Sequence, residues 1–156
     1  MDSRIEQALA ITPASRACER TIDITTTGAR TGRPRRIEVW FYRVDGQIYL
    51  STSPTRRGWY ANILANPRFT FHLKNGVRAD LPAVGTPVLE NGRRRAVFSG
   101  IIDDLNQPWN PAGIRQPVEP LAEWMEGSPL VRVEFPDVEF PEVQFPEVEF
   151  PEEVAR

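Results

Sequence analysis

The segment 25–36 is a glycine-punctuated turn that joins two apolar runs. Its twelve residues include four threonines, four arginines and two glycines. Glycines allow the backbone to bend and bring its N–H groups close to a ligand, threonine hydroxyls add donors, and guanidinium groups match phosphate oxygens in pairs. The segment therefore predicts a tight connection between strands that binds an anion, with phosphate as the first choice. A solvated hairpin turn with incidental positive charge is the alternative.

The runs on either side of this turn have the patterns of strands. Residues 21–25 alternate polar and apolar side chains, and residues 37–44 are dense in β-branched and aromatic ones. Asp45-Gly46 is a two-residue hairpin signal that leads into residues 47–52. We therefore expect the first three strands to form a meander.

The rest of the chain mixes helices and strands. Helical spacing over 57–66 ends at Pro67, and a half-buried strand over 68–74 is expected to turn His72 toward solvent. In the next strand, 77–89, Pro82 and Pro87 are compatible only with edge positions or bulges. Further elements are expected as a helix from about residue 91, a short helix around 118–125 and a last strand over 128–135.

Length and composition limit the chain to one ordinary folded domain. It has 156 residues, 40% of them hydrophobic, and no apolar run of the length of a membrane span or a signal peptide. We therefore expect a cytoplasmic protein. The single Cys18 cannot form an internal disulfide, and the single histidine excludes a histidine-rich metal site.

The net charge of −2 hides an asymmetry along the chain. Residues 134–156 hold eight acidic residues and one arginine, so residues 1–133 carry a net charge of +5. A cationic folded part favours an anionic ligand. Nucleic acid is a weak candidate, because the arginines are confined to turns and few exposed aromatic residues accompany them.

From residue 133 onward the sequence repeats Val-Glu-Phe-Pro-Glu with a period of five. Proline at every fifth position is incompatible with a continuous helix and removes a donor from a sheet. We therefore expect a folded domain over 1–135 and a low-complexity tail over 136–156 that is extended or disordered. The phenylalanines also allow the tail to pack along its own dimer or on a partner.

A second signature, Ser-Pro-Thr-Arg-Arg-Gly-Trp-Tyr-Ala-Asn-Ile-Leu-Ala-Asn-Pro at 53–67, follows the third strand. Together with the turn at 25–36, it resembles the deazaflavin (F420)-dependent nitroreductase family, over roughly residues 20–135. The resemblance implies a mainly β fold with α-helices (α+β), a split β-barrel of the FMN-binding, pyridoxamine-phosphate-oxidase-like type with peripheral helices.

The resemblance also implies the cofactor, coenzyme F420, and the residues that bind it. The turn that matches the phosphate contacts contributes Thr27, Gly28, Arg30, Thr31, Gly32 and Arg35, with Arg33 and Arg36 less firmly assigned. The end of the third strand, matching the segment along the deazaflavin ring, contributes Ser51, Thr52 and Ser53. The following helix and the residues before it contribute Arg56, Arg57, Trp59, Tyr60 and Asn62.

Arg56 and Arg57 precede a helix start, where the helix dipole already favours negative charge. A bound phosphate would relieve this conflict. However, Arg93, Arg94 and Arg95 occupy the start of another expected helix without any motif around them. Arginines at a helix start are therefore compatible with a site or with a solvated surface.

The activity implied by the resemblance is hydride transfer from the reduced deazaflavin to a quinone, a nitroaromatic or an activated alkene. Water, Ser53 or Tyr60 would supply the proton. Pro54 stands where several family members have a lysine, and the extended N-terminal helix of the nitroimidazole-reducing members is missing. An FMN-binding reductase of the same fold and a non-catalytic cofactor-binding protein therefore remain as alternatives.

A homodimer is expected from the strand 37–44. Trp40, Phe41 and Tyr42 follow one another, so they place aromatic side chains on both faces of this strand. One small monomer has a single interior, and a second copy would cover the other face.

Overall fold

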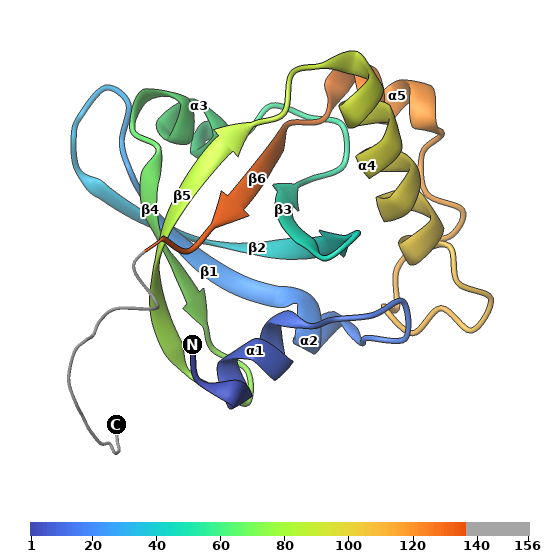
Figure 1. Ribbon diagram of the computed structural model, residues 1–156. Helices are drawn as coiled ribbons and strands as arrows, with labels where there is room; N and C mark the ends of the chain where they lie inside the picture. The colour runs from blue at the N-terminus through green and yellow to red at the C-terminus, as the bar shows by residue number, and fades with distance from the viewer. Residues whose placement is uncertain (137–156) are drawn as a thin grey trace.

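The computed structural model describes residues 1–136, so nearly all of the expected tail at 136–156 lies outside the described residues. The six strands of the described part form a closed barrel in the order β1-β2-β3-β6-β5-β4, with every neighbouring pair antiparallel (Figure 1). The mainly β architecture with peripheral helices confirms the predicted α+β split barrel. The elements are α1 (Ser3–Leu9), α2 (Ala17–Arg20), β1 (Thr21–Thr27), β2 (Pro34–Val44), β3 (Gln47–Ser51), α3 (Gly58–Ala65), β4 (Arg68–Leu73), β5 (Ala79–Pro87), α4 (Asn91–Leu105), α5 (Leu121–Gly127) and β6 (Leu130–Glu134).

The first three strands form the expected meander. Asp45 and Gly46 connect β2 to β3 with φ angles of 51° and 75°. Positive φ at both central residues is typical of a type I′ turn, whose twist matches that of the flanking strands. The pairing therefore continues to the turn, with Val44 opposite Gln47.

The two prolines of β5 occupy positions where a strand tolerates them. Pro82 lies opposite Thr70 of β4, whereas the pairing of β5 with β6 begins only at Val84. At Pro82 the strand therefore has a neighbour on one side only, as expected for an edge position. Pro87 is the last residue of β5.

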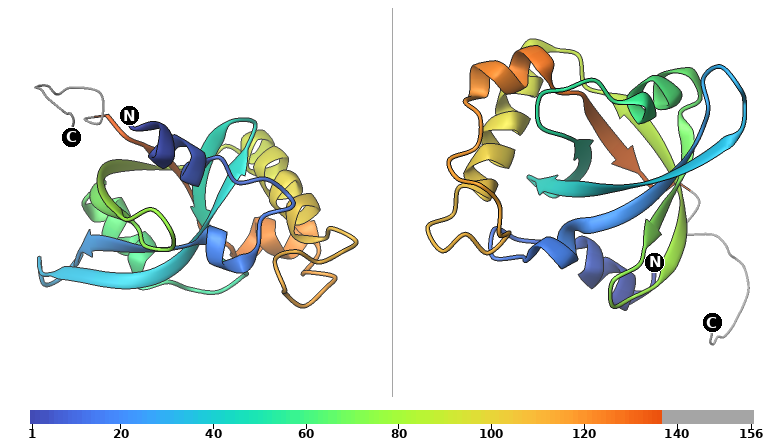
Figure 2. Two further views of the ribbon diagram at one scale, coloured as in Figure 1. Left: turned by 90° about the horizontal axis from the view of Figure 1, so that it is seen from below. Right: turned by 180° about the vertical axis from the view of Figure 1, so that it is seen from behind.

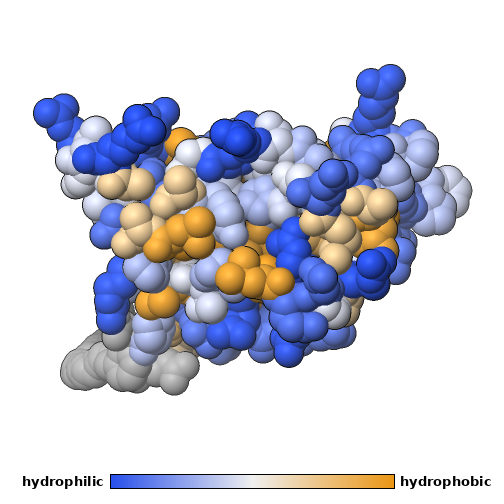
Figure 3. Space-filling view, turned by 90° about the horizontal axis from the view of Figure 1, so that it is seen from above, coloured by the Kyte–Doolittle hydropathy of each residue, from blue (hydrophilic) through white to orange (hydrophobic). Residues whose placement is uncertain are grey.

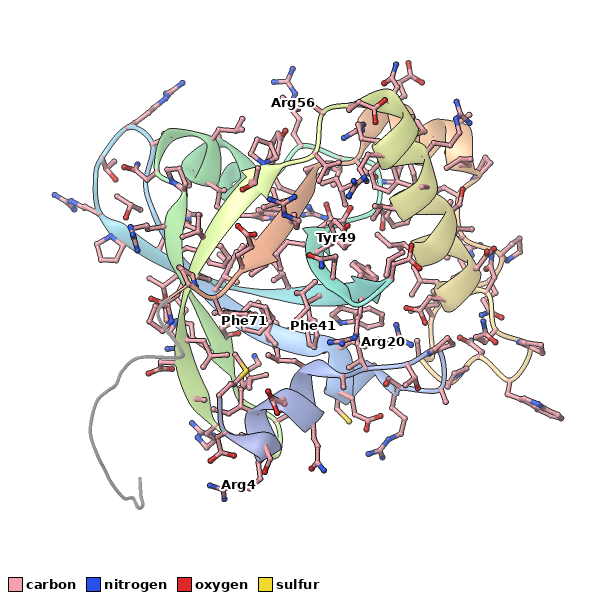
Figure 4. All side chains as sticks on the ribbon, in the orientation of Figure 1. Arg4, Arg20, Phe41, Tyr49, Arg56 and Phe71 are labelled. Atoms are coloured by element: carbon pink, nitrogen blue, oxygen red, sulfur yellow. The ribbon has the colours of Figure 1, made fainter. Side chains whose placement is uncertain are left out.

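The chain has two hydrophobic cores. One fills the barrel, where Phe41 and Phe71 meet edge to face with ring centroids 5.4 Å apart (Figure 4). The other lies between the barrel and the pair α4–α5, which pack against one flank of it in both views of Figure 2. Trp124 is 1% exposed in this second core and contacts Phe98, with ring centroids 5.7 Å apart.

The aromatic run of β2 is shared between these two cores. Phe41 points into the barrel, whereas Trp40 and Tyr42 belong to the core under α4 and α5. Both faces of this part of β2 are therefore covered within one chain. The aromatic run thus has an explanation that does not need a second copy.

A buried ion pair joins the N-terminal segment to α4. The guanidinium group of Arg20 is fully buried and donates to both carboxylate oxygens of Asp104, at 2.7 and 3.0 Å. It also donates to the carbonyl oxygen of Ser15 at 3.0 Å. These bonds tie α2 and the loop before it to the helix that covers the second core. Within residues 1–136, no helix has the length and apolar character needed to cross a membrane.

Candidate functional site

The turn between β1 and β2 is closed by its own backbone. The N–H of Gly28 donates to the carbonyl of Arg33 at 2.8 Å, and the N–H of Gly32 donates to the carbonyl of Gly28 at 2.9 Å. Gly32 has a φ of +70°, and a Cβ at Gly28 would lie 2.6 Å from the Thr31 hydroxyl oxygen. Both glycines are therefore required by the shape of this turn.

Helix α3 is fastened to this turn by Asn62. Its amide oxygen accepts from the N–H of Ala29 at 2.9 Å, and its amide nitrogen donates to the Thr26 hydroxyl at 3.0 Å. Asn62 and Thr26 are both buried. The helix and the turn therefore hold a fixed position relative to each other, although more than thirty residues separate them in the sequence.

Between the turn and the beginning of α3 lies a cavity of about 920 Å³, which we call the arginine cavity. Four arginines contribute their guanidinium groups to the lining of this cavity. Within residues 1–136, none of these four groups forms a side-chain hydrogen bond or an ion pair. Its acidic residue, Glu38, is bound to Lys74 at 2.5 Å. The uncompensated positive charge favours an anion as the ligand of this cavity. Its cationic lining residues are Arg30, Arg33, Arg35 and Arg57.

A second cavity, of about 640 Å³, adjoins the first, and Thr52 and Arg57 line both. We call it the aromatic cavity, because Trp40, Tyr42 and Trp124 form part of its wall. The end of β3 contributes one side of this cavity, and the connection between α4 and α5 contributes another. The lining residues from this connection and its two helices are Leu105, Ile114, Arg115, Pro117, Val118, Glu119, Pro120 and Trp124.

Most of the residues predicted from the sequence gather around these two cavities. Those that line the arginine cavity are Gly28, Arg30, Thr31, Arg35, Thr52, Arg57, Trp59 and Asn62. Those that line the aromatic cavity are Ser51, Thr52, Ser53 and Arg57. Thr52 and Arg57 thus connect the two groups.

Four of the predicted residues, Thr27, Gly32, Arg56 and Tyr60, line neither cavity. Tyr60 packs against the barrel core and contacts Trp59 edge to face, with ring centroids 6.1 Å apart. Arg56 extends away from the barrel (Figure 4). Two other predicted side chains already have partners inside the protein, since Asn62 binds the turn and the hydroxyl of Ser51 donates to the carbonyl of Pro129 at 2.7 Å.

The arginines at the start of α4 differ from Arg57 in their partners. Arg94 donates to the carbonyl oxygens of Val88, Met125 and Ser128, and its guanidinium group lies 5.0 Å from the Phe98 ring centroid. It therefore has a structural role in joining α4 to α5. Arg57, in contrast, lines both cavities with no such bonds among the described residues.

His72 does not face solvent, so this expectation was wrong. It is 6% exposed, and its Nε2 and Nδ1 atoms lie 2.7 Å from the Thr25 hydroxyl and from an Asp80 carboxylate oxygen. Hydrogen bonds to neighbouring strands hold the ring against the barrel wall. The bond from His72 lowers the pKa of the Asp80 carboxyl. Neither Thr25 nor His72 lines the arginine cavity or the aromatic cavity.

The fold is that of the split β-barrels related to pyridoxamine 5'-phosphate oxidase. A family model described as F420H(2)-dependent quinone reductase matches residues 14–101. The chain belongs to this family. No curated protein gives a significant match.

Solved structures with low sequence identity share the fold. A conserved hypothetical protein from Mycobacterium tuberculosis is 19% identical, with a TM-score of 0.57, and the match covers 93% of this chain and 92% of that one. A pyridoxamine 5'-phosphate oxidase-related, FMN binding protein from Nostoc punctiforme is 16% identical, with a TM-score of 0.54 and coverage of 85% and 78%. A structure described as a domain-swapped dimer is 21% identical, with a TM-score of 0.50 and coverage of 74% and 80%.

Proposed function

We propose that the protein binds reduced coenzyme F420, with the anionic tail in the arginine cavity and the deazaflavin ring beside Ser51, Thr52 and Ser53. The observation that carries this proposal is that the four guanidinium groups around one cavity have no side-chain partner among residues 1–136. They offer charge-assisted hydrogen bonds to a phosphate and to glutamyl carboxylates. The beginning of α3 adds free N–H groups to the same cavity.

When bound, reduced F420 supplies a hydride, which carries two electrons to the acceptor and leaves the oxidised cofactor. A quinone that accepts a hydride needs one further proton to become a quinol. The protein binds and orients both molecules and excludes water from the place where they meet. Ser53 lines the aromatic cavity, and its hydroxyl is therefore better placed than that of Tyr60 to pass on the proton from solvent.

The acceptor is proposed to be a quinone, with a nitroaromatic or an activated alkene as further substrates of the same hydride chemistry. Family membership supports a quinone, since the matching model describes quinone reductases. The adjoining aromatic cavity supports a flat apolar acceptor, because its wall contains two tryptophans and a tyrosine.

The test is a fluorescence titration of the cofactor-free protein with F420, in parallel with FMN. Arg35→Ala should weaken F420 binding by roughly ten- to a hundredfold, because a charge-assisted hydrogen bond contributes about 1.5–3 kcal/mol. Arg30→Ala should act in the same direction. Arg36→Ala is the matched control, because the Arg36 guanidinium lies outside the arginine cavity and binds Asp23 at 2.9 Å.

Three results would contradict parts of this proposal. Equal F420 affinities for the Arg30, Arg35 and Arg36 variants would contradict the assignment of the anionic tail of F420 to the arginine cavity. Tighter binding of FMN than of F420 would favour an FMN-binding reductase. Binding of F420 without oxidation in the presence of menadione, a small naphthoquinone, would favour a non-catalytic cofactor-binding protein.

We further propose that the protein is a cytoplasmic homodimer. Apolar surface lies between hydrophilic margins on the face seen in Figure 3. Leu64 on α3 and Leu89 before α4 are 50% and 69% exposed. A second copy packed on this surface would reduce the exposed fraction of both side chains. One fold neighbour is described as a domain-swapped dimer. A sedimentation mass of one chain, 17.7 kDa, at micromolar concentration would contradict the dimer.

A further inference from the structure

The arginine cavity runs along a strand edge that has no neighbouring strand in the described part of the chain. β2 pairs with β1 along residues 34–40, but its pairing with β3 begins only at Phe41. Side chains of a strand alternate between its two faces, yet adjacent residues such as Glu38 and Val39 both line the cavity. The edge of β2, with its backbone N–H and C=O groups, therefore forms one wall of the cavity.

The chemistry of this wall favours an extended occupant. A strand edge without a neighbour binds an extended segment by adding it as a further strand. The guanidinium groups of Arg33 and Arg35 attract carboxylates, and Ile37 and Trp59 offer apolar surface. The cavity therefore suits a segment that alternates acidic and apolar side chains.

The sequence of residues 137–156, which we call the acidic segment, has this pattern. It holds seven acidic residues and one arginine. Acidic and apolar residues alternate in 137–140 (Asp-Val-Glu-Phe) and again in 147–150 (Glu-Val-Glu-Phe). On an extended backbone, this alternation directs the carboxylates to one face and the apolar side chains to the other. The prolines between these stretches are acceptable, because a strand added to an edge is itself an edge strand.

Reach and charge favour the acidic segment over a second copy of the barrel. Its 20 residues span up to about 70 Å when extended, whereas a domain of this size measures roughly 40 Å across. Every face of the domain is therefore within reach. A second copy placed over the cavity by a two-fold axis would bring its own arginines against these arginines.

We propose that the acidic segment binds in the arginine cavity along β2 and competes there with the anionic tail of F420. The competition rests on the proposed function, whereas the binding of the segment does not. The segment thereby regulates access to the cofactor site. If it occupies the cavity for about 70–90% of the time, the apparent affinity for F420 is about threefold to tenfold lower than that of the open cavity.

The test compares two full-length variants that each lose four negative charges. The acidic-segment variant carries Glu139→Gln, Glu142→Gln, Glu147→Gln and Glu149→Gln. The matched control neutralises exposed acidic residues that line neither cavity, namely Glu6→Gln, Asp103→Asn, Glu123→Gln and Glu126→Gln. In a fluorescence titration the acidic-segment variant should bind F420 about threefold to tenfold more tightly than the wild-type protein, and the control should not. The gain should shrink in about 0.5 M NaCl, which screens the attraction of the segment to the cavity.

Phenylglyoxal, which modifies accessible guanidinium groups, reports the occupancy of the cavity without F420. Arg33 and Arg35 are exposed in the described part of the chain, as are Arg93 and Arg95 at the start of α4, which serve as internal references. Mass spectrometry should show that Arg33 and Arg35 react about threefold to tenfold faster, relative to the references, in the acidic-segment variant than in the wild-type protein or the control. This result together with a failure to bind F420 would support the docking of the segment and overturn the proposed function alone.

Two outcomes would overturn the docking of the acidic segment. Equal phenylglyoxal reactivity of Arg33 and Arg35 in the wild-type protein and the acidic-segment variant would show that the segment does not cover them, even if F420 binds. Protection that rises with protein concentration and is the same in both variants would show that a second copy covers the cavity instead.

Discussion

Replacing Asn62 with alanine should loosen the turn that forms the arginine cavity. The change removes the acceptor of the Ala29 N–H and the donor to the Thr26 hydroxyl. Each lost hydrogen bond costs about 0.5–1.5 kcal/mol, and the hydroxyl left unpaired at a position 2% exposed adds to this cost. We expect the free energy of unfolding to fall by about 2–4 kcal/mol, so Tm should fall by roughly 6–14 °C.

The same variant should also bind F420 more weakly at a temperature where it remains folded. Without Asn62 the turn and α3 are no longer held together. Cofactor binding must then order them, and the cost of this ordering lowers the affinity for F420. Asn66→Ala is the matched control, since Asn66 directly follows the last residue of α3 and its side chain makes no hydrogen bond among residues 1–136. The measurements are thermal unfolding followed by circular dichroism and fluorescence titration with F420. Equal Tm and equal affinity in the two variants would refute the role of Asn62.

Four further changes test the fold. Arg20→Ala leaves the Asp104 carboxylate buried without its partner and should cost about 3–5 kcal/mol in thermal unfolding. Glu90→Ala removes the side chain that caps α4 and should cost about 0.5–2 kcal/mol. Burial alone would raise the pKa of Asp23, but hydrogen bonds from Lys74 and Arg36 outweigh burial and lower this pKa. The stability that results is present above the unfolded pKa of about 3.9 and is lost as the pH falls through the folded pKa. The fall in Tm between pH 6 and pH 3 should therefore be smaller in Asp23→Asn than in the wild-type protein. Truncation after Phe135 should leave Tm unchanged, and a large fall in Tm would place the domain boundary elsewhere.

The six strands and the helices α3, α4 and α5 could be predicted, because each follows from a local pattern. The Asp45-Gly46 signal placed one hairpin, and alternating residues placed β1 and β4. The order β3-β6-β5 could not be obtained in this way, because β6 pairs with β3 across more than seventy residues. The burial of His72 was missed for a similar reason, since its partners Thr25 and Asp80 lie on two other strands.

The two cavities differ in how far the sequence reveals them. The arginine cavity is built from two compact motifs, so most of its lining was named from the sequence. The aromatic cavity takes Trp40 and Tyr42 from one strand and Trp124 from a helix some eighty residues later. Aromatic residues in strands and helices are usually core residues, and these three are indeed part of the second core. No local pattern marks the part of a core that faces a cavity.

The arginines show why side-chain type alone does not identify a site. Arg20, Arg36 and Arg94 all have partners within the protein, and these partners lie between 5 and 84 residues away in the sequence. Arg35 lies next to Arg36, yet strand alternation directs the two side chains to opposite faces, one toward the arginine cavity and one toward Asp23. A guanidinium group is available for a ligand only where folding provides it with no internal acceptor. The arginines without a partner among residues 1–136 therefore indicate the anion site, whereas the total number of arginines in the sequence does not.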